Sequence, residues 1–324
     1  MTASDAELLA ALGPCLGAAI AGLERRPSAY SSSFKMEELD VRLGPRDGGR
    51  TLEMLFKDLG HQGMLDGARR AKPSFLYEPL REIETYRKIL APERLGTATC
   101  YGAVADAAAG RYWLFLEKVP GRELYQEGDL AVWQQAARWL AGLHSRFAGR
   151  DDLQPLARAA HLLIYGPDFY RYWIGRACAA QPALERLAER YDLVVERLAA
   201  LPMTLLHGDF YASNVLVQET GEGNRICPVD WEMAALGPGL IDLAALTAGK
   251  WTEEERLALA LAYYDALPDP CRSLDEPAFL KALDGCRLHL AVQWLGWAPG
   301  WSPPAEHAHN WLGEALGLAD KLGL

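Results

Sequence analysis

Three side chains in the second half of the sequence have the types and the spacing that phosphoryl transfer requires. Asp209 follows His207 and Gly208, Asn214 comes five positions later, and Asp230 comes sixteen positions after Asn214. A positioned carboxylate can orient a substrate hydroxyl and accept its proton. An amide oxygen and a second carboxylate are ligands that suit Mg²⁺, which keeps phosphate and water oxygens as its other ligands. The spacing therefore predicts Asp209 as the base and Asn214 and Asp230 as metal ligands.

The elements around these residues support this division of roles. Residues 215–217 and 226–229 are short apolar runs that flank the turn sequence 220–224, which predicts a β-hairpin. Asp209 and Asn214 then lie in the loop before the hairpin, and Asp230 follows its second strand. Taken singly, an aspartate or asparagine in a turn is more often a cap; the ordered set favours catalysis.

The N-terminal part of the chain predicts a small, strand-rich region. We expect a helix over residues 4–23, a hairpin from strands 34–43 and 52–57 that ends on Lys57, a helix that begins at Glu78, and a strand over 112–117. Helical patterns then dominate, over 133–147, 183–201 and from 253 onward. Pro120-Gly121 lies between the strand-rich pattern and the helical pattern, so we expect domains at residues 1–119 and 120–324.

Composition excludes several classes of protein. The 324 residues include 33 Lys and Arg against 43 Asp and Glu, a net charge of −10, which argues against a nucleic-acid binder or a protein of acidic membrane surfaces. Six scattered cysteines without a CxxC pair predict reduced thiols. The longest apolar run, residues 8–23, is too short to span a membrane and lacks the basic flank of a signal peptide. We expect a cytoplasmic protein.

The motif His-Gly-Asp-x-x-x-x-Asn, followed by a hairpin and Val229-Asp-Trp-Glu232, resembles the aminoglycoside phosphotransferase family with its choline-kinase-like relatives. The run from Gly237 to Asp242 and on to Leu-Ala is also similar to that family. The resemblance implies an α+β, two-lobed protein-kinase-like fold with a small β-rich N-terminal lobe, a larger helical C-terminal lobe and ATP in the cleft between them.

The resemblance also implies roles for further residues of the second lobe. Asp209 matches the catalytic base, and Asn214 and Asp230 match the metal ligands. His207 matches a structural support of the catalytic loop. Asp242 matches the acid that braces this loop through hydrogen bonds.

In the first lobe, Lys57 matches the strand lysine that contacts the α- and β-phosphates, and Glu82 the helix glutamate that pairs with it. Glu84 competes for this second role. Residues 116–121 resemble the segment that joins the two lobes in this family. The resemblance implies that this segment binds adenine through the Glu117 carbonyl and the Val119 N–H. The expected phosphate-covering loop has serines where the kinase pattern has glycines; we assign Ser32 and Ser33 to phosphate contact.

These features predict an ATP- and Mg²⁺-dependent phosphotransferase whose acceptor is a hydroxyl of a small molecule, such as an aminoglycoside, amino alcohol, sugar or biosynthetic intermediate. The net charge and the acids Asp275, Glu276 and Asp284 favour a neutral or cationic acceptor. The choice between ATP and GTP stays open. Two alternatives remain, a kinase of peptide Ser or Thr and a nucleotide-binding pseudokinase scaffold. The intact Lys57 and Asp209 weigh against the second.

Two further groups near the C-terminus deserve an interpretation. His307 and His309 could form a metal pair, but without a third ligand a surface position is favoured. Four tryptophans have a spacing that favours a helical core, with a substrate wall as the alternative: Trp294, Trp297, Trp301 and Trp311.

Overall fold

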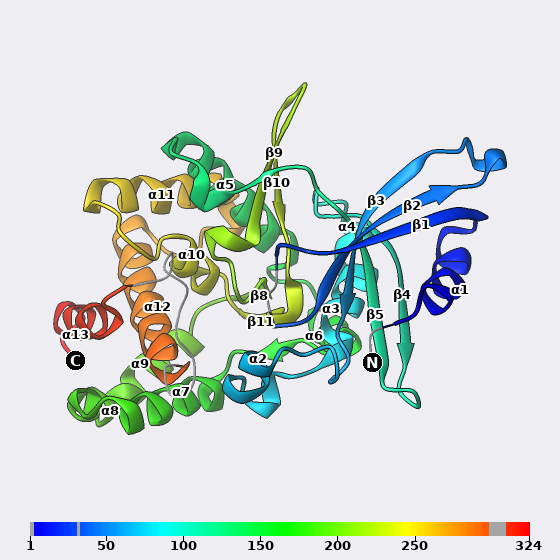
Figure 1. Ribbon diagram of the computed structural model, residues 1–324. Helices are drawn as coiled ribbons and strands as arrows, with labels where there is room; N and C mark the ends of the chain where they lie inside the picture. The colour runs from blue at the N-terminus through cyan, green and yellow to red at the C-terminus, as the bar shows by residue number, and fades with distance from the viewer. Residues whose placement is uncertain (1–2, 31–32, 298–308) are drawn as a thin grey trace. The chain divides into compact units, whose positions relative to one another are not determined.

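Two units make up the chain in the computed structural model, which describes residues 3–30, 33–297 and 309–324. One unit consists of Met1–Gly121 with Ala159–His161, and the other of Arg122–Arg158 with Leu162–Leu324. The first is rich in strands and the second in helices, as the sequence predicts, and the division falls close to Pro120-Gly121 (Figure 1).

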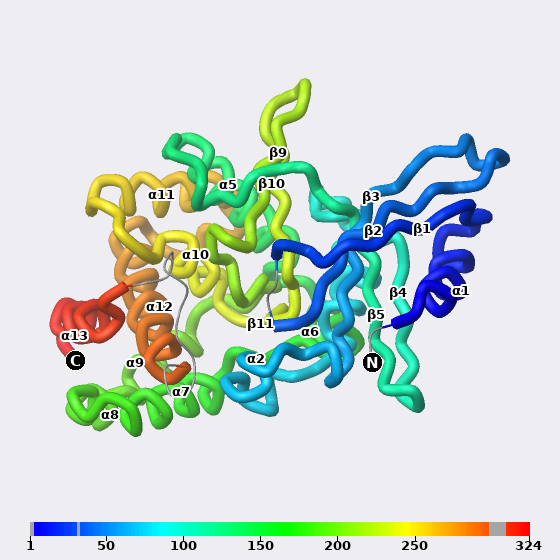
Figure 2. Tube along the Cα trace, in the orientation of Figure 1, coloured from blue at the N-terminus to red at the C-terminus, as the bar shows by residue number. Residues whose placement is uncertain are grey.

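Five antiparallel strands form the sheet of the first unit, in the order β1-β2-β3-β5-β4. The first three strands pair in chain order; β3 then pairs with β5, and β4, which precedes β5 in the chain, lies at the edge of the sheet (Figure 2). The bounds are β1 Ile20–Pro27, β2 Met36–Leu43, β3 Thr51–Asp58, β4 Cys100–Asp106 and β5 Arg111–Glu117. The helices of this unit are α1 Asp5–Leu16, α2 Asp66–Ala71, α3 Pro79–Glu84 and α4 Ala91–Glu93.

The prediction of one helix over 4–23 is wrong in its second half. The helix begins at a capping box, in which the Ser4 side chain accepts from the Glu7 N–H and the Glu7 carboxylate accepts from the Ser4 N–H. It ends at Gly17, whose φ of 59° is the left-handed cap that glycine adopts without strain. The chain then turns into β1, which the sequence analysis missed together with β4.

The two faces of this sheet differ in what they bury. Met54 and Phe56 of β3 pack with Trp113 and Phe115 of β5 against the α1 side chain Leu8 in one apolar core. Because side chains alternate along a strand, Lys57, the residue after Phe56, points to the opposite face. The predicted helix after Glu78 is α3, continued by a π-helical turn over Thr85–Leu90.

The second unit is built around α12, Glu276–Trp297, which is buried on all sides from Leu283 to Gly296. Helices α7, α10 and α13 pack against it. This buried stretch also carries charged side chains, and two of them, Asp284 and Arg287, pair with each other. The bounds of the helices in this part of the chain are α5 Leu130–Phe147, α6 Leu153–Ala159, α7 Pro167–Ala180, α8 Glu185–Ala188, α9 Tyr191–Ala199, α10 Leu240–Leu246, α11 Glu253–Ala266 and α13 Trp311–Lys321.

Two small sheets of this unit lie at the ends of the loop that carries Asp209. In one, β10 (Gly223–Pro228) pairs with β9 (Val215–Thr220) and β9 with β6 (Arg122–Glu123), which confirms the predicted hairpin. In the other, β11 (Ala235–Pro238) lies between β7 (Leu163–Ile164) and β8 (Met203–Leu206). The helical stripe predicted over 183–201 is divided into α8 and α9.

The remaining expectations about the chain as a whole concern membranes and thiols. None of the helices in residues 3–30, 33–297 and 309–324 is long and apolar enough to cross a membrane. All six cysteines lie in these ranges and are free thiols, as the sequence predicts.

Candidate functional site

The loop with Asp209 leaves β8 through a turn that only glycine can make. Gly208 has a φ of 82°, and a Cβ placed on it would lie 2.0 Å from the Met233 carbonyl oxygen. Any other residue would meet both backbone strain and a backbone clash. The local sequence therefore fixes the direction in which Asp209 leaves the strand.

Asp209 and Asn214 are joined directly across the loop. The Asn214 Nδ2 donates to the Asp209 carbonyl oxygen and to its Oδ2, both at 2.9 Å. The Tyr211 N–H donates to the same carbonyl at 2.8 Å. Because both donated bonds use the Nδ2 end of the amide, the Oδ1 of Asn214 is the end left to serve as a metal ligand.

Asp242 holds the start of this loop, as the resemblance implies. Its Oδ2 accepts from the His207 N–H at 2.7 Å and its Oδ1 accepts from the Gly208 N–H at 2.9 Å. The side chain is 1% exposed, so these bonds replace its hydration. Two adjacent amides fixed by one carboxylate leave the loop little freedom ahead of Asp209.

Two residues that sequence reasoning missed extend this network. The His144 Nε2 lies 3.3 Å from Asp242 Oδ2, and its Nδ1 lies 2.8 Å from the Tyr263 hydroxyl. His144 is on the buried face of α5, where the sequence shows only one polar residue in an apolar stripe. That isolated polar residue was the available signal, and a partner 98 positions away could not be read from it.

Asp230 is brought to the same loop by the end of β10. The Val229 N–H donates to the Asn214 carbonyl at 2.9 Å, and the Val229 carbonyl lies 2.9 Å from the His207 Nε2. Asp230 itself has a φ of 64°, a left-handed conformation that is uncommon for a residue with a side chain. Such conformations collect at functional sites, where the surroundings enforce them.

The residues present fit a magnesium ion bound together with a phosphate ligand. Within the described residues no group of three or more His, Cys, Asp and Glu is placed to hold a metal by itself. Asn214 and Asp230 offer one amide and one carboxylate oxygen donor group. Mg²⁺ is commonly held by one or two carboxylates, with substrate phosphates and water completing its shell.

In the first unit, Lys57 pairs with Glu82. The Lys57 Nζ lies 2.7 Å from the Glu82 Oε2, and the residues are 3% and 1% exposed. The competing Glu84 pairs instead with Lys88 at 2.9 Å, four residues further along the chain. The geometry thus favours Glu82 for the helix glutamate of the resemblance.

The other nucleotide-contact predictions fall on the strand end and the serine run. The Glu117 N–H donates to the Thr99 carbonyl, and its carboxylate accepts from the Thr99 N–H at 2.9 Å. Val119 is buried. The Ser33 carbonyl accepts from the Leu65 N–H, and Ser32 lies outside the described residues. The nucleotide contacts of these four residues stay predictions.

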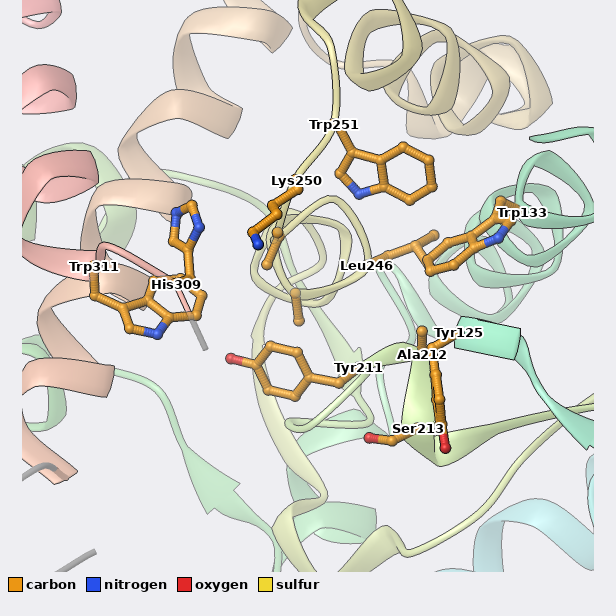
Figure 3. Close-up of a pocket in the computed structure, with 13 residues that line it drawn as sticks. Tyr125, Trp133, Tyr211, Ala212, Ser213, Leu246, Lys250, Trp251, His309 and Trp311 are labelled. Carbon is orange, nitrogen blue, oxygen red and sulfur yellow. The ribbon is translucent and has the colours of Figure 1, made fainter. Parts of the chain in front are cut away.

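A cavity of about 270 Å³ in the second unit lies against the loop between Asp209 and Asn214. Tyr211, Ala212 and Ser213, which lie between Asp209 and Asn214, form part of its lining. Figure 3 shows Trp133 and Trp251 on one side of it, and His309 and Trp311 on the other. We call this cavity the loop pocket. Its full lining is Tyr125, Trp133, Tyr211, Ala212, Ser213, Ala245, Leu246, Ala248, Gly249, Lys250, Trp251, His309 and Trp311.

The C-terminal tryptophans therefore divide between core and pocket. Trp311 lines the loop pocket, with Trp294 stacked on it at a ring separation of 5.0 Å. Trp297 packs against Trp173, and Trp301 lies outside the described residues. His307 also lies outside them, while His309 is hydrogen-bonded to the Glu314 carboxylate.

Solved structures with the same fold are kinases and phosphotransferases of small molecules. A choline kinase from Cryptosporidium parvum is 13% identical, with 98% of this chain and 94% of that chain covered and a TM-score of 0.59. A macrolide 2'-phosphotransferase from Brachybacterium faecium is 18% identical, with coverages of 97% and 98% and a TM-score of 0.57. An aminoglycoside 2'-phosphotransferase-IIIa, solved as a GDP complex, is 14% identical, with coverages of 94% and 92% and a TM-score of 0.54.

These similarities confirm the predicted α+β, kinase-like fold. No curated protein matches the sequence. The model of the phosphotransferase enzyme family matches residues 68–280, which include Glu82, the loop from Asp209 to Asn214, Asp230 and Asp242. The chain thus belongs to the phosphotransferase enzyme family.

Proposed function

We propose that the protein transfers the γ-phosphoryl group of ATP, bound with Mg²⁺, to a hydroxyl of a small molecule. The observation that carries the proposal is the loop in which Asn214 is hydrogen-bonded to Asp209 at 2.9 Å, with β10 delivering Asp230 alongside. The proposal is supported by the chemistry of phosphoryl transfer, which needs a carboxylate for the acceptor beside oxygen donors for a metal.

In the proposed reaction, Asp209 orients the acceptor hydroxyl and takes its proton. The acceptor oxygen forms a bond to the γ-phosphorus while the bond from that phosphorus to the β–γ bridging oxygen breaks. The products are the phosphate ester and ADP, which carries the electron pair of the broken bond. The hydrogen bond from Asn214 holds the Asp209 carboxylate in one orientation, so little reorganisation is required during the step.

Asn214 and Asp230 would hold the magnesium ion through their side-chain oxygens. When bound, the ion neutralises the charge that develops on the phosphate oxygens. Asp242 acts only through the loop, because its carboxylate is occupied by the His207 and Gly208 amides.

Lys57 would contact the α- and β-phosphates, with Glu82 holding its ammonium group in place. Ser32, Ser33, the Glu117 carbonyl and the Val119 N–H complete the proposed nucleotide contacts. The aminoglycoside phosphotransferase with a similar fold was solved with GDP, so GTP is the second nucleotide to examine.

Nucleoside diphosphate release from ATP and from GTP tests the proposal. The panel should contain amino alcohols, sugars, aminoglycosides, macrolides and peptides with Ser or Thr, with mass spectrometry of the products. We expect turnover with a small alcohol and a gain of one phosphoryl group. Turnover only with the peptides would favour the protein-kinase alternative, and nucleotide binding without any turnover would favour the pseudokinase.

Asp209→Asn gives the matched control for this experiment. We expect its turnover to fall by about 10²–10⁴, the usual value of general base catalysis, while its affinity for Mg·ATP stays within a few fold. A variant that keeps most of its activity would show that Asp209 is not the base.

The metal assignment has its own test. Asp230→Ala should abolish turnover at ordinary Mg²⁺ concentrations, and added Mg²⁺ should rescue Asn214→Ala better, because a neutral amide contributes less attraction for the ion than a carboxylate. If added Mg²⁺ restores neither variant, or restores Asp230→Ala better, the assignment is wrong.

A further inference from the structure

Residues that follow Asp209 closely in the chain line the loop pocket, which makes it the candidate site for the acceptor. Tyr211 and Ser213 line it, and both belong to the five-residue step from Asp209 to Asn214. Burial raises the pKa of the Tyr211 hydroxyl, and the negative charge of the Asp209 carboxylate raises it further. A molecule in this pocket therefore contacts the segment that carries the base.

Aromatic side chains dominate opposite sides of the pocket. The rings of Trp133 and Trp251 meet edge to face at 4.7 Å, and Trp311 lies flat on Trp294 with an interplanar angle of 4°. Tyr125 contributes a further ring to the lining. Rigid, paired indoles offer flat apolar surfaces, which suit a planar ring better than a polyhydroxylated body.

One lysine is the only Lys, Arg, Asp or Glu among the described residues of the pocket lining. The lining includes Lys250, and no Asp or Glu is among the described residues that form it. Figure 3 shows the Lys250 side chain between the indole of Trp251 and the ring of His309. Aromatic faces alone would attract an ammonium ligand, but an ammonium group already in the same cavity repels a second one and attracts an anion.

The acids that suggested a cationic acceptor from the sequence are engaged elsewhere. Asp284 is buried and pairs with Arg287 at 3.2 Å and with Lys321 at 2.7 Å. Asp275 accepts from the Ala278 N–H at the start of α12, and neither it nor Glu276 lines the loop pocket. Although the net charge is −10, no carboxylate lies on the described part of the pocket wall.

We propose that the acceptor is a small alcohol with a flat apolar ring and a single anionic group, and that Lys250 sets this preference for charge. The inference rests on the proposed phosphotransferase function and names its acceptor class. A cavity of about 270 Å³ corresponds to nine or so water volumes, room for roughly ten non-hydrogen atoms, which is the size of a substituted benzyl alcohol.

Three probes of equal shape and different charge test the preference. They are 4-(hydroxymethyl)benzoate, 1,4-benzenedimethanol and 4-(aminomethyl)benzyl alcohol, titrated calorimetrically into the full chain. We expect the carboxylate to bind about threefold more tightly than the diol, and the diol more tightly than the ammonium compound, in line with one exposed ion pair. Equal affinities, or tightest binding of the ammonium compound, would overturn the inference.

Lys250→Glu should reverse this order. The matched control is Lys281→Glu, which makes the same charge change on the exposed side of α12 and away from the pocket lining. It should leave the order intact. An order that Lys250→Glu does not alter, or that Lys281→Glu alters equally, would show that Lys250 is not the determinant.

The shape requirement is tested with trans-4-(hydroxymethyl)cyclohexanecarboxylate, which keeps both functional groups but is not planar. We expect it to bind several-fold more weakly than the benzoate to the wild type, and Trp251→Leu to reduce this difference. Equal binding of the two to the wild type would overturn the flat-ring part of the inference.

Turnover separates this inference from the function on which it rests. Turnover of other alcohols, combined with no charge order among the probes, would reject the acceptor class and keep the phosphotransferase. The expected charge order, combined with no nucleoside diphosphate release from any alcohol, would reject the phosphotransferase.

Discussion

Two carboxylates are buried to the same degree in the two units, and they are held in different ways. Glu82 and Asp242 are each 1% exposed. Glu82 faces the ammonium group of Lys57, whereas Asp242 accepts from the backbone amides of His207 and Gly208 and lies beside His144. The first is an ion pair between side chains, and the second is a carboxylate bound by the main chain.

The two carboxylates differ in whether substitution can remove their partners as well. An ion pair can be removed as a pair, because apolar residues can replace both members and leave no charge behind. The amides that bind Asp242 belong to the main chain and cannot be removed by substitution. The second unit therefore depends on its buried carboxylate for the shape of the loop, while the first uses its carboxylate to place a lysine.

The largest effect is expected for Asp242→Ala. Two buried amides lose their acceptor, and at about 1–3 kcal/mol each the free energy of unfolding should fall by about 2–6 kcal/mol. Turnover should also collapse, because the start of the Asp209 loop is no longer fixed. Urea unfolding and kcat measure the two effects; an unchanged unfolding midpoint would show that these bonds contribute nothing.

Glu82→Leu should lower the free energy of unfolding by about 3–5 kcal/mol, since it removes the carboxylate that lies against the buried Lys57 ammonium group. The double variant Lys57→Met with Glu82→Leu should recover most of this loss and still fail to turn over nucleotide. A double variant as unstable as the single one would show that the ion pair cannot be replaced by apolar residues as a pair.

Tyr263→Phe should lower the free energy of unfolding by about 1 kcal/mol, the value of one hydrogen bond, here that to His144. The matched control is Tyr264→Phe, which removes a hydroxyl bonded to the Leu274 carbonyl at 3.0 Å. Both should be destabilised, but only the first should lower kcat, because only Tyr263 connects to Asp242 through His144. Equal kcat values in the two variants would confine His144 and Tyr263 to a purely structural role.

The smallest effect is expected at a third carboxylate, Glu38, whose side chain is 13% exposed. Hydrogen bonds from Lys118, at 2.6 Å, and Arg26 lower the pKa of Glu38. A carboxyl whose pKa is lower in the folded chain stabilises it above the unfolded value of 4.5, and this stabilisation is lost as the pH falls through the folded value.

Glu38→Gln should therefore lower the free energy of unfolding at pH 7, by less than about 1 kcal/mol, and flatten its decline on the acid side. Unfolding curves between pH 7 and pH 3 measure this. If the free energy of unfolding of the variant falls as steeply toward pH 3 as that of the wild type, Glu38 is not the source of this decline.

The fold and site could be predicted where the information is local. Asp209, Asn214 and Asp230 lie within one loop and hairpin, so their spacing alone indicates that they meet. Lys57 and Glu82 were assigned only through the family resemblance, and the ion pair between them agrees with that assignment. The strand β4, with its small residues and weak alternation, gave no such signal.

The parts of the fold and site that could not be predicted depend on contacts between segments far apart in the chain. The sheet of β7, β11 and β8 joins segments that are only two to four residues long and far apart in the chain. The His144–Asp242 contact and the loop pocket likewise combine residues from several helices. The charge of the pocket wall depends on which of many surface groups face inward, and net composition does not specify this.

The paired indoles around the loop pocket also give the protein an intrinsic spectroscopic signal for ligand binding. Trp294 and Trp311 lie nearly parallel at 5.0 Å, and Trp133 meets Trp251 at an angle of 82°. Transition dipoles held this close in fixed, asymmetric orientations couple to each other and give strong near-ultraviolet circular dichroism. A ligand that shifts either pair alters this coupling, so occupancy of the pocket can be followed spectroscopically in the unlabelled chain.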